Sequence, residues 1–161
     1  MPKLSAGLLP YRVRDGVVEV LIAHPGGPFW ARKDDGAWSI LKGEFTDGDD
    51  PWEAAQREFT EETGLAPPAG PRIDFDPVRQ PSGKVLTAFA IKGDLDISDA
   101  RSNAFEIEWP RGSGRMREFP EVDRVQWFSV EHARTKLLKG QRVILDRLMA
   151  QPDLSGLRES Q

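Results

Sequence analysis

The segment between Asp50 and Gly64 constrains the fold most, because helix signals mark both of its ends. Asp50 can accept hydrogen bonds from free backbone N–H groups, Pro51 suits the first helical position, and Glu53 completes a capping box. Gly64 is a typical helix stop. The sequence therefore predicts one helix with fixed ends in the first half of the chain.

Strand patterns lie on both sides of this helix. Residues 4–14 and 17–24 are apolar, partly alternating runs separated by Asp15-Gly16, which predicts a hairpin with a tight turn. The Pro-Gly-Gly-Pro stretch in residues 25–30 predicts a loop. Further strands are expected over 38–41, 72–80, 84–92, 105–109 and 122–128, a loop or short helix over 94–103, a loop over 111–117, and helices over 129–138 and 141–149.

Length and composition favour one globular domain. A chain of 161 residues can bury a core without staples, and we expect a single domain over residues 1–151 with a flexible tail over 152–161. No apolar run approaches the roughly 18 residues of a membrane span, so no membrane partner is expected. The chain has no cysteine, which excludes disulfides and thiolate metal sites. Its start lacks the apolar stretch of a secretory signal, so a cytoplasmic location is expected.

The charge balance bears on the class of partner. The formal net charge is −4 at pH 7, which argues against non-specific binding to nucleic acid. It does not exclude a phosphorylated small molecule, because a bound cation can carry the necessary positive charge.

Three glutamates share one stripe of the predicted helix. At about 100° per residue, Glu58, Glu61 and Glu62 fall within a sector of roughly 100°. Such carboxylates repel one another unless solvent, basic partners or a hard cation relieve the repulsion. Pro51 and Ala54 lie on the same stripe and leave it accessible. By itself, an acidic stripe is more often a solvated helix face, so the wider pattern must decide.

A longer motif surrounds the stripe. It runs Gly43, five residues, Asp49, seven residues, Arg57-Glu58-Phe59, any residue, Glu61-Glu62, any residue, Gly64-Leu65. This resembles the Nudix box of a family of hydrolases that cleave phosphoanhydride bonds. Every specified position matches except Asp49, which stands where the family has glutamate. Asp49 either helps Asp50 to cap the helix or still contributes to the site.

The resemblance implies a fold and a cofactor. The fold would be α/β, a Nudix-type α/β/α sandwich with a mixed sheet between helices. The cofactor would be Mg²⁺, with Mn²⁺ able to substitute, and it would activate a water molecule. The resemblance implies as metal ligands Gly43 through its carbonyl, Glu58, Glu61 and Glu62. Arg57 would pair with a ligand carboxylate and orient it, or else pair with Glu53 across one turn for purely structural reasons.

A later carboxylate is also expected from the resemblance. Family members often carry one in a loop several residues before a tryptophan, and Glu121 stands six residues before Trp127. Glu121 would serve as metal ligand or general base. Glu108 is the rival candidate. The expected catalytic residues are thus Glu58, Glu61, Glu121 and Arg57.

Cations and aromatic residues near the motif are candidates for substrate contacts. Lys42 and the arginines of the 111–117 loop, including Arg115, would hold phosphates. The aromatic candidates for stacking on a base are Trp30, Trp38 and Phe45. The expected substrate is nucleoside diphosphate-linked or a dinucleoside polyphosphate, because Leu41-Lys42-Gly43-Glu44 is similar to the diadenosine polyphosphate hydrolase branch. A non-catalytic module that senses nucleotides or binds partners is the alternative, and a homodimer is compatible with either.

Overall fold

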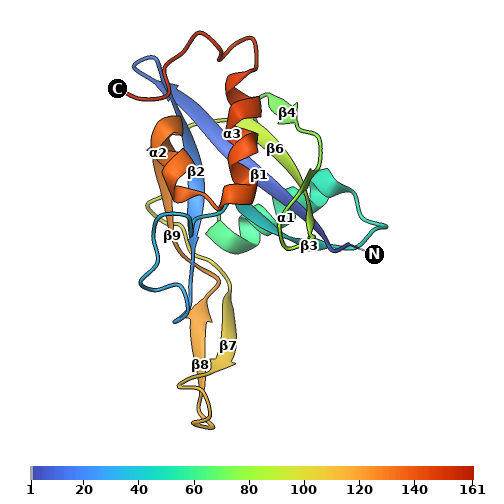
Figure 1. The fold of residues 1–161 in the computed structure, drawn as a ribbon, viewed down its shortest axis with the longest axis vertical. Helices are drawn as coiled ribbons and strands as arrows, with labels where there is room; N and C mark the ends of the chain where they lie inside the picture. Colours follow the sequence, from blue (N-terminus) through green and yellow to red (C-terminus); the bar gives the residue numbers. More distant parts are fainter. Residues whose placement is uncertain (1) are drawn as a thin grey trace.

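A computed structural model describes residues 2–161. A seven-stranded sheet lies between helix α1 (Pro51–Thr63) on one face and helices α2 (Val130–Lys136) and α3 (Arg142–Met149) on the other (Figure 1). Two apolar clusters fill the spaces between the sheet and these helix layers. The predicted α/β/α sandwich is confirmed. No helix within residues 2–161 combines the length and apolar character needed to cross a membrane.

The sheet is mixed, with the order β4-β6-β1-β2-β9; in addition, β3 pairs with β1 and β5 with β6. Its strands are β1 (Leu4–Arg14), β2 (Val17–Pro25), β3 (Leu41–Phe45), β4 (Arg72–Asp74), β5 (Val78–Arg79), β6 (Val85–Lys92) and β9 (Val122–Ser129). The pairing of β1 with β6 is parallel and the others are antiparallel. The first part of β1 pairs with β3 and its last part with β2. The two partner strands therefore diverge along the same edge of β1.

Local signals account for the first hairpin and for α1. Asp15 has a φ of 53° and Gly16 a φ of 76°, and two successive positive values characterise the tight turn that suits a hairpin. The side chain of Asp50 accepts a hydrogen bond from the Glu53 N–H at 3.2 Å. Gly64 ends α1 with a φ of 72°. Phe59 of α1 is fully buried against the sheet, and its burial contributes about 2–3 kcal/mol of free energy.

The C-terminal helices cover the other face of the sheet. The Ser129 hydroxyl accepts a hydrogen bond from the His132 N–H at 3.2 Å and caps α2, as its position in the sequence predicts. A 3-10 turn, η1 (Lys139–Gln141), joins α2 to α3. Ile144, Leu145 and Leu148 of α3 are fully buried against the sheet, which confirms the helical spacing of the apolar residues.

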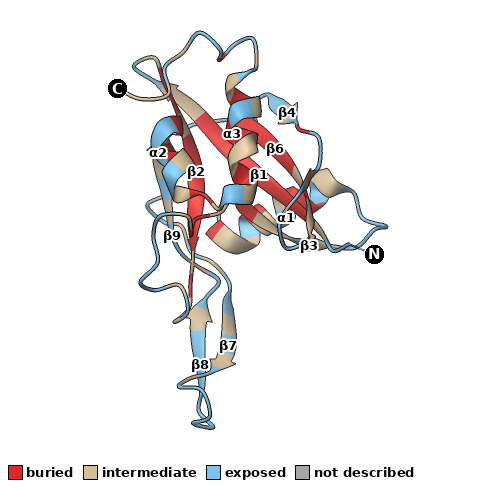
Figure 2. Ribbon diagram, viewed as in Figure 1, coloured by how far each residue is buried: buried red, intermediate tan, exposed pale blue. Residues whose placement is uncertain are grey.

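A second, two-stranded sheet extends from the body of the molecule. It consists of β7 (Ala104–Glu108) and β8 (Met116–Pro120), and it projects as a hairpin whose surface is largely exposed (Figures 1 and 2). The expected loop over 111–117 is therefore too long, since Met116 and Arg117 belong to β8. The sequence pattern missed β8 because neither of its faces is buried, so its residues do not alternate between apolar and polar.

The segment 152–161, expected to be a flexible tail, instead lies against the domain. Leu154 is 3% exposed and belongs to the core beside α3. Arg158 accepts a backbone hydrogen bond from the Val18 N–H and donates one to the Gly16 carbonyl, both at 3.0 Å. The sequence did not indicate this contact, because two leucines among polar residues give no periodic signal, yet Leu154 and Leu157 both pack against the core.

Candidate active site

Gly43 of β3 and Glu58 of α1 meet at the centre of the site. A Cβ atom added at Gly43 would lie 2.1 Å from the carboxyl carbon of Glu58, far inside van der Waals contact. The absence of a side chain at Gly43 thus gives Glu58 its place, and the Glu58 side chain is only 13% exposed. The structure brings these two predicted residues together.

Glu62 lies one turn further along α1 and also faces β3. Its carboxylate accepts a hydrogen bond from the Lys42 N–H at 3.1 Å. Burial raises the pKa of Glu62 to about 8, against an ordinary value of 4.5. Burial, followed by repulsion from Glu61, raises the pKa of Glu58 as well. Both groups would be more stable as carboxylates if a cation stood beside them.

Glu121 borders the same cavity as Glu62. It connects β8 to β9 and is fixed at both backbone groups: its N–H donates to the Asn103 carbonyl at 2.8 Å, and its carbonyl accepts from the Gly26 N–H at 2.9 Å. A cavity of about 140 Å³ is lined by Glu121, Glu62, Lys42, Ala23, Pro25, Ser39, Ile40 and Val122. The structure therefore brings Glu121 to the carboxylates of α1.

Glu108, the rival of Glu121, lies elsewhere. It ends β7 in the projecting hairpin, and its carboxylate accepts a hydrogen bond from the Gly112 N–H in the hairpin turn. Its position serves the turn, because it does not border the cavity that contains Glu121.

Lys42 and Arg57 both lie beside the acidic cluster. Lys42 borders the cavity, and the pKa of its ammonium is lowered by burial first and then by the neighbouring Lys84. Arg57 forms an ion pair with Glu58, with Nη2 at 3.6 Å from Oε1. Among residues 2–161, Arg57 makes no such pair with Glu53, so the purely structural alternative is not observed.

Asp49, which stands where the motif has glutamate, belongs to the turn before α1. Its carboxylate accepts hydrogen bonds from the Thr46 hydroxyl at 2.7 Å and from the Thr46 N–H at 3.3 Å. These bonds hold the pKa of Asp49 below its usual value. The helix cap is formed by Asp50 instead. Asp49 thus closes a turn and does not border the cavity.

The aromatic candidates separate in the structure. Trp38 is 1% exposed and packs edge-on against His24 and Phe128, with ring centroids 5.3 Å and 5.1 Å away, so the expectation that it stacks on a base is wrong. Trp30 lies partly exposed in the loop after β2, with the Lys33 ammonium 5.1 Å from its ring centroid. Phe45 borders a separate surface cavity of about 370 Å³.

Arg115 is not brought to the carboxylates. It lies in the turn of the β7–β8 hairpin, at the end that points away from α1 (Figure 1). The five residues of β8 separate this turn from Glu121.

Gln141 supports the site and was not singled out from the sequence. It is fully buried; its side-chain oxygen accepts a hydrogen bond from the Ile40 N–H at 2.9 Å, and its side-chain nitrogen donates to the Ser39 hydroxyl at 3.0 Å. These bonds fix the segment that leads into Lys42 and Gly43. The available signal was a polar residue directly before an amphipathic helix.

The donor groups suit a hard divalent cation, although they do not form a closed cage. Within residues 2–161, no three acidic or histidine side chains converge closely enough to hold a metal ion as they stand. The available donors are nonetheless carboxylate and carbonyl oxygens, which Mg²⁺ prefers. Gly43 admits the Glu58 carboxylate close to its own backbone, and the burial of Glu58 and Glu62 favours a compensating positive charge. The residues of the site therefore fit such a cation.

Comparison with known proteins identifies the family. The model of the NUDIX domain matches residues 1–148. The chain therefore belongs to the Nudix family of pyrophosphohydrolases.

Solved structures of the family share the fold. A Caenorhabditis elegans Ap4A hydrolase in a binary complex is 19% identical, with a TM-score of 0.61, over 94% of this chain and 98% of that chain. The Nudix domain of Shewanella oneidensis NrtR, complexed with ADP ribose, is 17% identical, with a TM-score of 0.60, over 92% and 89%. A NUDIX hydrolase from Listeria monocytogenes is 16% identical, with a TM-score of 0.62, over 96% and 97%. No curated protein matches the sequence.

The raised pKa of Glu62 predicts a pH-dependent stability of the metal-free protein. The folded chain holds the Glu62 proton up to about pH 8, whereas the unfolded chain releases it near pH 4.5, so stability is lost as pH rises between these values. In excess chelator, Glu62→Gln should raise Tm at pH 8.5 by roughly 10 °C, since the raised pKa corresponds to about 4 kcal/mol and 1 kcal/mol corresponds to about 2–4 °C for a chain of this size. The gain should vanish at pH 5. Equal shifts at both pH values, or the same shift in the exposed control Glu118→Gln, would contradict this account.

Proposed function

We propose that this protein hydrolyses a phosphoanhydride bond in a nucleoside diphosphate-linked or dinucleoside polyphosphate substrate, with Mg²⁺ as cofactor and Mn²⁺ as a substitute. The observation that carries the proposal is the meeting of Glu62 of α1 with Glu121 and Lys42 at one cavity, with Glu58 close enough to act on Glu62. The cavity thus combines carboxylates, which can bind a metal ion or accept a proton, with a lysine, which can bind a phosphate.

The cation would be held by the Gly43 carbonyl, Glu58, Glu61 and Glu62. When bound, it would supply positive charge to the phosphate oxygens and acidify a water molecule. Arg57 orients the Glu58 carboxylate through the ion pair between them. Fixing a ligand in this way preserves its geometry.

The remaining groups act on the substrate and the water. Lys42 borders the cavity, and we assign to its ammonium the binding of a phosphate oxygen. Glu121 is exposed to solvent and held by its backbone, so its carboxylate can accept the proton of the attacking water. The water oxygen forms a bond to the attacked phosphorus. The bond between this phosphorus and the bridging oxygen breaks, and the bridging oxygen leaves with the bonding electrons as part of the second phosphate product.

The substrate class rests on the motif and receives support from the neighbours. The names of two similar structures include Ap4A and ADP ribose, and both compounds contain phosphoanhydride bonds between nucleoside or sugar groups. Trp30 and Phe45 are the remaining candidates for stacking on a base. The acidic net charge of −4 disfavours nucleic acid as a partner.

We also propose a setting for the reaction. A chain without cysteine suits the reducing cytoplasm, where we place the activity. A homodimer is compatible with this function, since the proposed site is formed by one chain.

A screen of phosphoanhydride compounds tests the proposal. Dinucleoside polyphosphates, ADP-ribose and nucleoside triphosphates are incubated with the protein and Mg²⁺, and both products of each are identified. We expect turnover of at least one compound with two nucleoside or sugar ends, and its loss in excess chelator. Undiminished turnover in chelator would refute the metal requirement. Binding of nucleotides without turnover would favour the non-catalytic module instead.

Gly43→Ala tests whether the glycine makes room for Glu58. The added Cβ would displace the Glu58 carboxylate, and we expect turnover to fall by about 10- to 100-fold, as for other misplacements of a reacting group. Tm should change little, because the flexible end of a side chain can move. Gly48→Ala is the matched control, since no atom lies within 4 Å of its added Cβ. Equal activity of the two variants would contradict the assigned role.

Glu121→Gln and Glu108→Gln test the identity of the general base. Removing the base should lower turnover by about 10²- to 10⁴-fold, and we expect this loss for Glu121→Gln. Glu108→Gln should retain turnover, since Glu108 belongs to the hairpin turn. Measured kcat values for both variants decide the matter: an essential Glu108 beside a dispensable Glu121 would reverse the assignment.

A further inference from the structure

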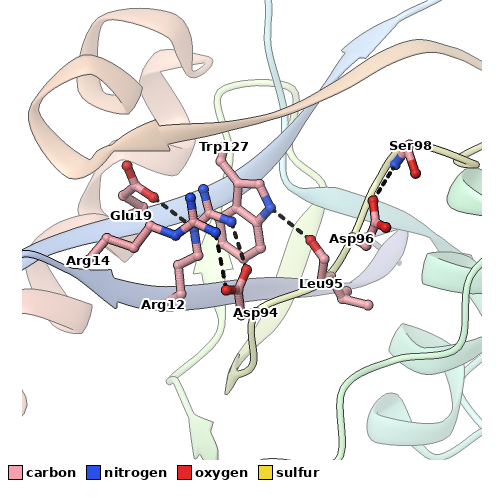
Figure 3. A network of polar contacts seen from close by, with 8 residues as sticks. All are labelled: Arg12, Arg14, Glu19, Asp94, Leu95, Asp96, Ser98 and Trp127. Atoms are coloured by element: carbon pink, nitrogen blue, oxygen red, sulfur yellow. Dashed lines mark hydrogen bonds and ion pairs between the residues drawn. The ribbon is translucent and has the colours of Figure 1, made fainter.

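The connection between β6 and β7, residues 93–103, is attached to the sheet at its first half. The Arg12 guanidinium group lies 4.1 Å from the centroid of the Trp127 ring. Arg12 also donates a hydrogen bond to Asp94 at 2.8 Å (Figure 3). The indole N–H of Trp127 donates to the Leu95 carbonyl at 3.2 Å. Both contacts fix the start of the connection on strands β1 and β9.

The second half of the same connection runs between α1 and Glu121. The Asn103 N–H donates to the Glu61 carbonyl at 2.8 Å, and the Asn103 carbonyl accepts from the Glu121 N–H at 2.8 Å. One residue thus bridges the backbone of the carboxylate helix and the backbone of the proposed base. The Arg101 N–H donates to the Thr63 carbonyl at 2.7 Å and strengthens the attachment to the end of α1.

Ser102 adds a side-chain contact to this bridge. Its hydroxyl donates to the Asn103 carbonyl at 2.8 Å and accepts from the Val122 N–H at 3.0 Å. Val122 follows Glu121 directly and begins β9. The Ser102 hydroxyl therefore holds the backbone on the C-terminal side of Glu121, while Asn103 holds the Glu121 amide itself.

The position of Glu121 explains why such a contact matters. Glu121 lies where the projecting β7–β8 hairpin joins the body of the molecule (Figure 1). A two-stranded hairpin is only marginally stable by itself, so its motion would be transmitted to the joint. On the other side of Glu121, the Gly26 N–H donates to the Glu121 carbonyl, and Gly26 packs so closely that an added Cβ would lie 1.9 Å from the Pro120 oxygen. Glu121 is thus held between two segments.

We propose that Ser102 is a positioning residue of the hydrolase, whose hydroxyl holds the Glu121–Val122 backbone in register with α1 and so places the Glu121 carboxylate over the site. This inference rests on the proposed function, in which Glu121 accepts a proton from water. Ser102 does not contact the reacting atoms. Its effect reaches the reaction only through Glu121.

Variants of Ser102 test the inference. Ser102→Ala leaves the Val122 N–H without its acceptor, and we expect kcat to fall about 10-fold while KM changes less than about twofold, since displacement of a catalytic group acts on the chemical step. Ser102→Thr keeps the hydroxyl and should restore kcat to within about twofold. The matched control is Ser98→Ala in the same connection, where the Ser98 N–H donates to the Asp96 carboxylate (Figure 3). The Val122 N–H is bound by Ser102 and not by Ser98. Ser98→Ala should leave kcat unchanged.

A double variant separates positioning from general stabilisation. In the Glu121→Gln background there is no base to position, so adding Ser102→Ala should lower kcat by less than about twofold further. An undiminished 10-fold loss in that background would show that Ser102 acts elsewhere and would overturn the proposal. Wild-type kcat in Ser102→Ala, beside a large loss in Glu121→Gln, would refute positioning while leaving the proposed function intact.

Amide hydrogen exchange gives a readout that does not depend on activity. The Val122 amide should exchange at least about 10-fold faster in Ser102→Ala than in the wild type or in Ser98→Ala, because its hydrogen bond is lost. Unchanged protection of Val122 would show that the hydroxyl does not hold this backbone, which overturns the proposal. An inactive wild type with this exchange pattern would instead refute the proposed function alone.

Discussion

The close approach of α1 to β3 is the contact on which the site depends. Gly43 has no side chain, so the Glu58 carboxyl group occupies the space where a Cβ would stand, and the Lys42 N–H reaches Glu62 in the next turn. This packing removes two acidic groups from water, which is unfavourable for their charged forms. The apolar flank of α1 offsets that cost, because Ala54, Ala55 and Phe59 are buried against the sheet. The helix is thus held by its apolar residues in a place where its acidic residues favour a cation.

Motifs with local causes were predictable from the sequence. Helix α1 begins at the cap formed by Asp50 and ends at Gly64 in its left-handed conformation. Asp15-Gly16 forms the turn of the first hairpin. Each of these features involves only neighbours in the chain. The resemblance to the Nudix box implied that Gly43 and Glu58 belong to one site, and the structure brings these two residues together. Glu121 was found through its distance from Trp127, and it does reach the same cavity as Glu62.

Features that depend on distant contacts could not be predicted in the same way. A tryptophan such as Trp38 can stack on a base, and only its packing against His24 and Phe128 shows that it belongs to the core. Strand β8 has no buried face, so it shows no alternation, and its presence moves Arg115 away from the carboxylates. The contribution of Gln141 is similar, because its two partners precede it by about a hundred residues. Sequence periodicity reports burial along one element and is silent on contacts between elements.

The topology of the sheet has a consequence for the order in which the molecule folds. The Gly43–Glu58 pair can form early, since it closes a short loop. The pairing of β2 with β9, which joins Leu21 to Trp127 and brings Glu121 into place, and the parallel pairing of β1 with β6 close far longer loops. Long-range pairings of this kind slow folding, because chain entropy is lost before the contacts form. A folding intermediate with α1 docked on the first strands would therefore contain the α1 carboxylates and Gly43 while lacking the late carboxylate, so hydrolytic competence would be acquired only in the final stage of folding.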